Sequence, residues 1–134
     1  MTKLRKSHYI DYMEKKINRA DGSYLALMVE MEDKDNSFRS IDIAKELNIS
    51  KAAVSHQIGV LQDQGLVVKR PYGKISLTDK GRDVGKLVIK KREAIQTVLE
   101  QAGVPSTISK KNAQELCHDI DDDLYECIKD KDNK

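Results

Sequence analysis

The hydrophobic period of the chain changes from about four residues to about two directly after Gly65. Before this glycine, apolar residues recur every three or four positions, a spacing typical of amphipathic helices. After it, Leu66-Val67-Val68 and Ile75-Ser76-Leu77 flank the turn residues Pro71-Tyr72-Gly73. These residues predict a short β-hairpin. A helical unit that ends in a hairpin is a narrow class of fold.

Two short helices joined by a tight turn are expected before the hairpin. Ser40 is expected to cap the first helix and Ser50 the second, over residues 51–64, because a serine hydroxyl accepts from free N–H groups of a first turn. Asn48 tolerates the left-handed backbone that the exit from the first helix needs. Ile49 in the turn is expected to point into the core. This order of elements predicts a winged helix-turn-helix, a DNA-reading unit.

The second helix has an apolar inner face and a polar outer face. Val54, Ile58 and Leu61 form the inner face, and short outer residues would let the helix enter a major groove. Neutral polar groups suit base edges, whereas cations on the hairpin suit phosphates. The residues expected to contact DNA are Lys51, Ala52, Ser55, His56, Gln57, Lys69, Arg70, Tyr72, Lys74 and Arg39.

The charge of the chain is concentrated on the same unit. The formal net charge of the whole chain is only +2. Residues 51–92, however, carry ten basic and three acidic side chains, a net of +7, while residues 115–134 carry three and eight, a net of −5. A basic block that coincides with a recognition motif is the electrostatic footprint expected of a phosphate-binding surface.

Four further helices are predicted outside this unit. An amphipathic helix is expected over residues 4–19, and a second one, capped by Ser23, is expected to end near Glu32. Thr78 is expected to cap a long helix that runs to about residue 102. One last helix is expected over residues 109–128. The wide apolar stripes of the last two predict a layer that pairs two copies of the chain.

The predicted fold class is mostly α, a winged helix-turn-helix domain followed by a helical dimerisation layer. Residues 1–20 are a basic N-terminal helix or arm, and residues 21–78 are the DNA-binding domain. Residues 79–128 form the dimerisation region with a metal-sensing role, and residues 129–134 are a charged tail. No apolar window is long enough to cross a membrane. Two cysteines fit a reducing cytoplasm.

A set of residues spread along the chain matches the pattern of a known family. These residues are Ile41 to Ser50, Val54-Ser55, Leu66-Val67, Leu77 to Gly81, Gly85-Lys86, Arg92-Glu93, Leu99 and Gly103-Val104. On them, the chain resembles the diphtheria-toxin-repressor and manganese-transport-regulator family. The resemblance covers residues 22–128, and the long helix and the helix with His118 separate this family from multiple-antibiotic-resistance-type regulators. It implies a homodimeric repressor whose affinity for DNA depends on Fe²⁺ or Mn²⁺.

The resemblance also implies a metal site on three helices. Laying the family's ligand run on residues 114–118 gives Cys117 and His118 as donors. Gln114 shares their helix face, and Asp121 or Asp122 would complete the set. A cysteine with a histidine favours Fe²⁺ or Zn²⁺ over Mn²⁺, which prefers oxygen ligands. The other ligand positions fall on Ser23, Ala26 and Arg92, which are poor ligands, and a guanidinium stays protonated.

Several functions remain open at this point. The leading hypothesis is a transcription regulator, a repressor on a palindromic operator, and not an enzyme, because no nucleophile–base or carboxylate pair stands out. One alternative is a metal-independent member in which Arg92 pairs with an acidic residue of the last helix and replaces the charge of the ion. Another senses a small molecule or a redox state, with Cys117 as the sensor. The third is a winged helix that only binds protein.

Overall fold

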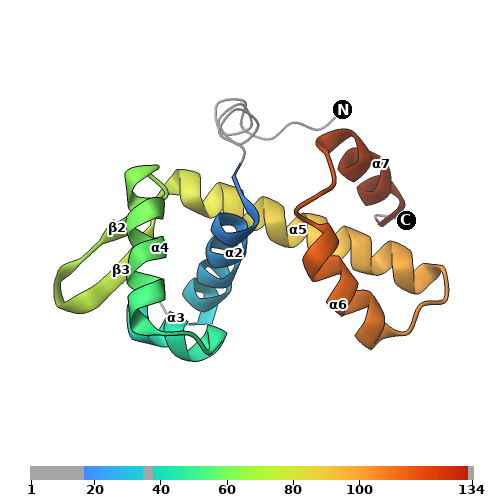
Figure 1. Ribbon diagram of the computed structural model, residues 1–134. Coiled ribbons are helices and arrows are strands. Elements are labelled where there is room, and N and C mark those ends of the chain that lie inside the picture. Colours follow the sequence, from blue (N-terminus) through green and yellow to red (C-terminus); the bar gives the residue numbers. More distant parts are fainter. Residues whose placement is uncertain (1–16, 35–37, 133–134) are drawn as a thin grey trace.

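The computed structural model describes residues 17–34 and 38–132 (Figure 1). The predicted class, a winged helix-turn-helix followed by a helical layer, is confirmed. The helix predicted for residues 4–19 lies, up to residue 16, outside the described residues. In chain order the elements are α2 (Arg19–Lys34), β1 (Phe38–Arg39), α3 (Ser40–Leu47), α4 (Lys51–Asp63), β2 (Val67–Lys69), the 3-10 turn Pro71–Gly73, β3 (Lys74–Leu77), α5 (Asp79–Gln101), α6 (Ser106–Leu116) and α7 (Asp122–Asp132).

The turn between α3 and α4 follows local rules that the sequence carries. Asn48 is left-handed, with φ 56° and ψ 49°, as predicted. The Ser50 hydroxyl accepts from the backbone N–H of Ala53 at 3.1 Å, so the predicted cap of α4 is confirmed. The prediction for Ile49 was wrong. Its side chain is 41% exposed, because the fully buried Ile43 and Val54 already fill the core of this unit.

The prediction that Ser40 caps the first of these helices was also wrong. Ser40 is the first helical residue of α3, and the cap is Arg39, whose backbone N–H donates to the Asp42 carboxylate at 2.9 Å. Strand β1 pairs antiparallel with β3, with Phe38 opposite Ile75, and the strand order is β1-β3-β2. A two-residue strand has no alternation by which it could be detected.

Helix α2 begins five residues earlier than predicted. Ser23 lies inside it, and the first turn is capped by Asn18, whose side-chain oxygen accepts from the Asp21 N–H at 2.8 Å. Gly22 does not break the helix. A Cβ at this position would lie 3.2 Å from the His118 ring, so the glycine is explained by close packing.

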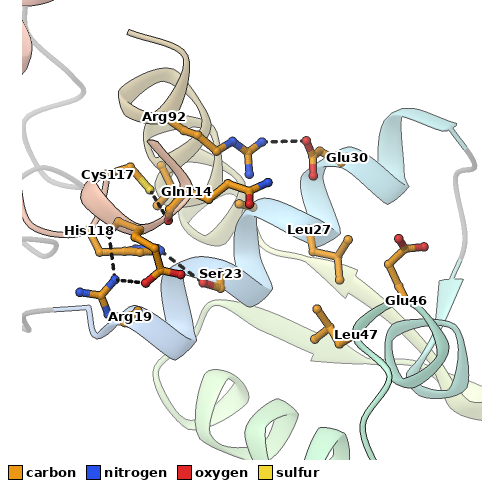
Figure 2. Close-up of a pocket in the computed structure, with 13 residues that line it drawn as sticks. Arg19, Ser23, Leu27, Glu30, Glu46, Leu47, Arg92, Gln114, Cys117 and His118 are labelled. Atoms are coloured by element: carbon orange, nitrogen blue, oxygen red, sulfur yellow. Dashed lines mark hydrogen bonds and ion pairs between the residues drawn. The ribbon is translucent and has the colours of Figure 1, made fainter. Parts of the chain in front are cut away.

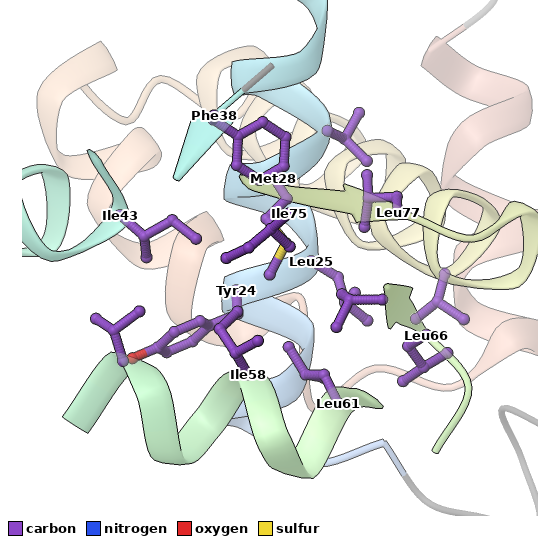
Figure 3. Close-up of a cluster of buried hydrophobic side chains, with 14 of the residues drawn as sticks. Tyr24, Leu25, Met28, Phe38, Ile43, Ile58, Leu61, Leu66, Ile75 and Leu77 are labelled. Atoms are coloured by element: carbon purple, nitrogen blue, oxygen red, sulfur yellow. The ribbon is translucent and has the colours of Figure 1, made fainter. Parts of the chain in front are cut away.

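A single hydrophobic core fills the winged unit (Figure 3). The inner faces of α2, α3 and α4 meet the sheet there, and Leu66 and Leu77 bring in the base of the hairpin. The members labelled in Figure 3 are Tyr24, Leu25, Met28, Phe38, Ile43, Ile58, Leu61, Leu66, Ile75 and Leu77.

Helix α5 runs across both halves of the molecule (Figure 1). Thr78 caps it as predicted, because its hydroxyl accepts from the Gly81 N–H at 3.0 Å. Helix α2 packs closely on it: a Cβ at Gly85 would lie 2.6 Å from the Leu25 carbonyl oxygen. Among the described residues, no helix combines the length and the apolar character needed to span a bilayer.

The single last helix predicted over residues 109–128 is two helices, α6 and α7, with a break between them. Asp121 caps α7, because its carboxylate accepts from the Leu124 N–H at 2.8 Å. Lys91, only 1% exposed, donates to the Ile120 carbonyl at 3.2 Å and pairs with Asp122 at 3.1 Å. The spacing of apolar residues continues from α6 into α7, so the hydrophobic pattern of the sequence does not reveal the break between them.

Candidate nucleic-acid interface and adjacent pocket

The outer face of α4 is open to solvent. Lys51, Ala52, Ser55 and His56 are all exposed, on the side away from the core residue Ile58. Their side chains are short or neutral, apart from the lysine in the first turn. The helix therefore presents hydrogen-bonding groups near its N-terminal end, the arrangement by which recognition helices contact base edges.

Gln57 differs from the other residues predicted to contact DNA. Its side-chain amide donates to one carboxylate oxygen of Asp21, and the amide of Gln64 donates to the other oxygen at 3.1 Å. Asp21 is buried, so this carboxylate ties α2 to the recognition helix. Sequence reasoning missed this role, because the predicted helix began after Ser23 and the partners of Asp21 lie 36 and 43 residues away in the chain.

The hairpin and the start of α3 supply exposed cations. Tyr72 at the tip is 86% exposed and has a φ of 64°, which is unusual for a residue other than glycine. Arg70 donates to the Ser76 hydroxyl at 2.9 Å. In residues 17–34 and 38–132, no carboxylate forms an ion pair with the exposed cations Arg39, Lys51, Lys69, Arg70 or Lys74.

A pocket of about 330 Å³ lies beside this unit, where α2 faces α5 and α6 (Figure 2). Three of the four predicted metal ligands line it, and Asp121 does not. Glu46 and Leu47 of α3 close it on the side of the winged unit. The remaining lining residues are Arg19, Ser23, Ala26, Leu27, Glu30, Val88, Arg92, Gln114, Glu115, Cys117 and His118.

Polar contacts cross the pocket between helices. The Arg92 guanidinium on α5 pairs with Glu30 of α2 at 2.8 Å, and His118 Nε2 lies 3.3 Å from the Ser23 hydroxyl oxygen (Figure 2). Arg19 pairs with Asp119 at 3.0 Å. The alternative that Arg92 pairs with an acidic residue of the last helix was therefore wrong about the partner, which lies on α2 instead.

Comparisons of sequence point to bacterial and archaeal regulators. Residues 31–69 match the profile of the arsR family of bacterial regulatory proteins. An uncharacterized HTH-type transcriptional regulator of Methanocaldococcus jannaschii is 29% identical over 100 residues, which are 74% of this chain and 80% of that protein. The HTH-type transcriptional regulator MntR of Shouchella clausii is 25% identical over 107 residues, 80% of this chain and 75% of that protein.

Solved structures share the fold over most of this chain. The manganese regulator SloR gives a TM-score of 0.73 at 24% identity, over 84% of this chain and 53% of that one. The structure of IdeR of T. acidophilum gives a TM-score of 0.71 at 20% identity, over 84% of this chain and 54% of that one. A manganese-dependent transcriptional repressor in complex with manganese gives a TM-score of 0.74 at 24% identity, over 83% of this chain and 51% of that one. The chain spans about half the length of these three regulators.

The predicted resemblance is confirmed. The chain has the fold of the diphtheria-toxin-repressor and manganese-transport-regulator family, and two of its sequence relatives are named MntR. At these identities the solved structures establish the fold alone. Whether the pocket of this chain could hold a cation depends on its own donor atoms.

The donor atoms of the pocket do not fit a divalent cation. Cys117 is buried, its thiol donates to the Gln114 carbonyl at 3.3 Å, and burial raises the pKa of the thiol, which opposes the thiolate that a metal needs. Burial, and then the charge of Arg19, lower the pKa of His118, which favours the neutral imidazole that a metal would need, so His118 is the one donor here that suits a cation. Arg92 adds a fixed positive charge that repels a cation. Within the described part of the chain, no three His, Cys, Asp or Glu residues cluster as metal ligands do.

Proposed function

We propose that the chain is a cytoplasmic, homodimeric transcription regulator that binds specific double-stranded DNA sequences and represses the genes beside them. The observation that carries the proposal is the outer face of α4. It combines neutral hydrogen-bonding side chains with an exposed lysine. The hairpin cations that flank it form no ion pair with a carboxylate of residues 17–34 or 38–132. The names of the sequence relatives support the same function.

In this proposal, the N-terminal half of α4 enters the major groove. Ser55 and His56 contact base edges, and Ala52 allows close approach. The cations at the helix start and on the hairpin contact phosphates, which fix the register without reading sequence. Gln57 positions the recognition helix rather than contacting the DNA, because its amide donates to Asp21 of α2.

The dimer forms through the helical layer, residues 79–128. Exposed apolar side chains on α6 and α7, namely Ile108, Leu116 and Leu124, support an interface there. A two-fold dimer presents two recognition helices to two half-sites, so the operator is a palindrome. Residues 21–78 then act as the reading unit of each protomer.

Metal dependence, with Fe²⁺, Mn²⁺ or Zn²⁺ held by Cys117, His118, Gln114 and Asp121, stays a prediction from the resemblance. The names of the relatives support it. The donor set argues against it, because Asp121 lies outside the pocket lining and caps α7 instead. We therefore assign no step of DNA binding to a metal.

Selection of bound duplexes from a random-sequence pool tests the function. We expect enrichment of a palindromic site and, by light scattering, two protein chains per duplex. A His56→Ala, Ser55→Ala double variant should still bind DNA but lose the enrichment, while a Lys110→Ala variant on α6 should keep it. Absence of enrichment together with salt-independent binding would leave the chain as a protein-binding winged helix.

A further inference from the structure

The Arg92 side chain places a positive charge in the lining of the pocket. The Arg92–Glu30 ion pair, at 2.8 Å, joins α5 to α2, and the Arg92 side chain is only 20% exposed. A guanidinium is protonated at every physiological pH. The pair therefore links these two helices without a bound metal ion.

A second set of contacts joins α2 to α6 at the same place. The Ser23 hydroxyl oxygen lies 3.3 Å from His118 Nε2, and Arg19 donates to the Glu115 carbonyl at 2.9 Å. The Gly22 backbone approaches the His118 ring closely enough that a Cβ would lie 3.2 Å from it. Side chains of this chain thus make the α2–α5 and α2–α6 links across the pocket.

Helix α2 is also the helix that supports the recognition helix. Asp21, one residue before Gly22, accepts from Gln57 and Gln64 of α4. A displacement of α2 from α5 would therefore move α4 relative to the layer that pairs the protomers. The spacing of the two recognition helices depends on how firmly α2 is held.

We propose that the Arg92–Glu30 pair is a permanent substitute for a bound metal cation, so that the affinity of this regulator for DNA does not depend on divalent metal. The inference rests on the proposed function. A metal changes DNA affinity only by binding one arrangement of the helices better than another. A covalently attached cation that already holds this arrangement leaves no such difference.

The first experiment uses the wild-type protein and a duplex selected in the presence of excess EDTA. We expect a specific duplex sequence to be enriched in EDTA, and the affinity for that duplex to stay the same after addition of Mn²⁺ or Zn²⁺. Metal analysis of protein purified without chelator should find less than one ion per chain, and neither ion should raise the melting temperature. Stoichiometric metal, or tighter DNA binding with either ion, would overturn the inference.

The second experiment removes the ion pair. Arg92→Gln and Glu30→Gln should each weaken DNA binding several-fold, whereas Lys90→Gln, the same charge change at an exposed position of α5, should have a smaller effect. The Glu30 variant is decisive, because removing a negative charge would strengthen binding to DNA if overall charge alone mattered. The charge-exchanged double variant Glu30→Arg, Arg92→Glu should recover part of the loss.

The outcomes separate the two proposals. Enrichment only in the presence of Mn²⁺ or Zn²⁺ would overturn the ion-pair inference and leave the regulator function intact. Unchanged DNA affinity of the Glu30→Gln variant would also overturn the ion-pair inference and leave the regulator function intact. This variant is expected to fold, because the Glu30 side chain is 46% exposed. Absence of DNA binding by wild-type protein under every condition would instead overturn the proposed function.

Discussion

The cations of the winged unit and those of the pocket have opposite surroundings. Lys51, Lys69 and Lys74 are exposed, and in the described residues no carboxylate pairs with them. Arg19 and Arg92 each pair with a carboxylate at 3.0 Å or less. An unpaired cation is available to a phosphate, whereas a paired one holds helices together. Position in the fold separates the two kinds of cation, because Arg39 and Arg70 of the winged unit are also exposed and pair with no carboxylate of the described residues.

The largest expected effect tests the cations of the winged unit. If Lys51, Lys69, Arg70 and Lys74 each contact a phosphate in both protomers, the slope of log K against log salt is about −7. Substituting all four by Ala should bring the slope close to zero. Titration of a labelled duplex at several salt concentrations measures it.

Lys110→Ala and Lys111→Ala on α6 provide the matched control. Both lysines are exposed cations far along the chain from the winged unit. Their removal should leave the slope nearly unchanged. An equal decrease of the salt slope in the winged-unit variant and in the α6 variants would mean that both regions bind DNA alike. That result would contradict the contrast between the two groups of cations.

The next effect concerns how closely the two regions pack. A Cβ at Gly85 would lie 2.6 Å from the Leu25 carbonyl oxygen, so Gly85→Ala should lower the free energy of unfolding by about 2–3 kcal/mol. Gly59 on α4 has nothing within 4 Å of its Cβ position, and Gly59→Ala should raise it by about 0.5–1 kcal/mol. Urea unfolding measures both. Equal effects would show that α2 does not pack tightly on α5.

The starts of α4 and α5 and the exit from α3 could be predicted because their signals are local. The caps Ser50 and Thr78 and the left-handed Asn48 each act within three or four residues of their own position. The helical layer was predicted less well. The break before α7 depends on the buried Lys91, whose partners Ile120 and Asp122 are about thirty residues away, and no local pattern reports such a contact.

The pocket could be predicted only in part. The resemblance placed Cys117 and His118 at the site, and both line it. It could not show that Glu30 of α2 faces Arg92, because 62 residues separate them in the chain. Asp21 escaped prediction for the same reason, since its partners lie on α4.

A smaller effect distinguishes residues that read bases from those that position the helix. Ala at Ser55 or at His56 should reduce the preference for the selected site by about 1–3 kcal/mol. Gln57→Ala should instead weaken binding to all sequences alike and lower the free energy of unfolding by about 1–2 kcal/mol, because buried Asp21 loses a donor. Competition with specific and random duplexes separates the two results. A change of sequence preference in the Gln57 variant would make Gln57 a reader.

The smallest expected effect on binding concerns the two thiols, one in the pocket and one outside it. Cys127 is exposed, so it should react quickly with a chromogenic disulfide reagent, and its modification should leave DNA affinity unchanged. Cys117 is buried, and burial raises the pKa of its thiol, so at pH 8 it holds less of the reactive thiolate than a free cysteine does.

The sign of the pH dependence follows from that raised pKa. The folded state favours the protonated thiol, so the stability gained at Cys117 is present below the ordinary cysteine pKa of about 8.5 and is lost as the pH rises through the folded value. In a Cys127→Ser variant, which leaves one thiol, native protein should react slowly and urea-unfolded protein quickly. A Cys117→Ala variant should lose the pH dependence above about 8.5. Rapid reaction of native Cys117, with a change in DNA affinity, would favour a redox sensor in the pocket over a fixed ion pair.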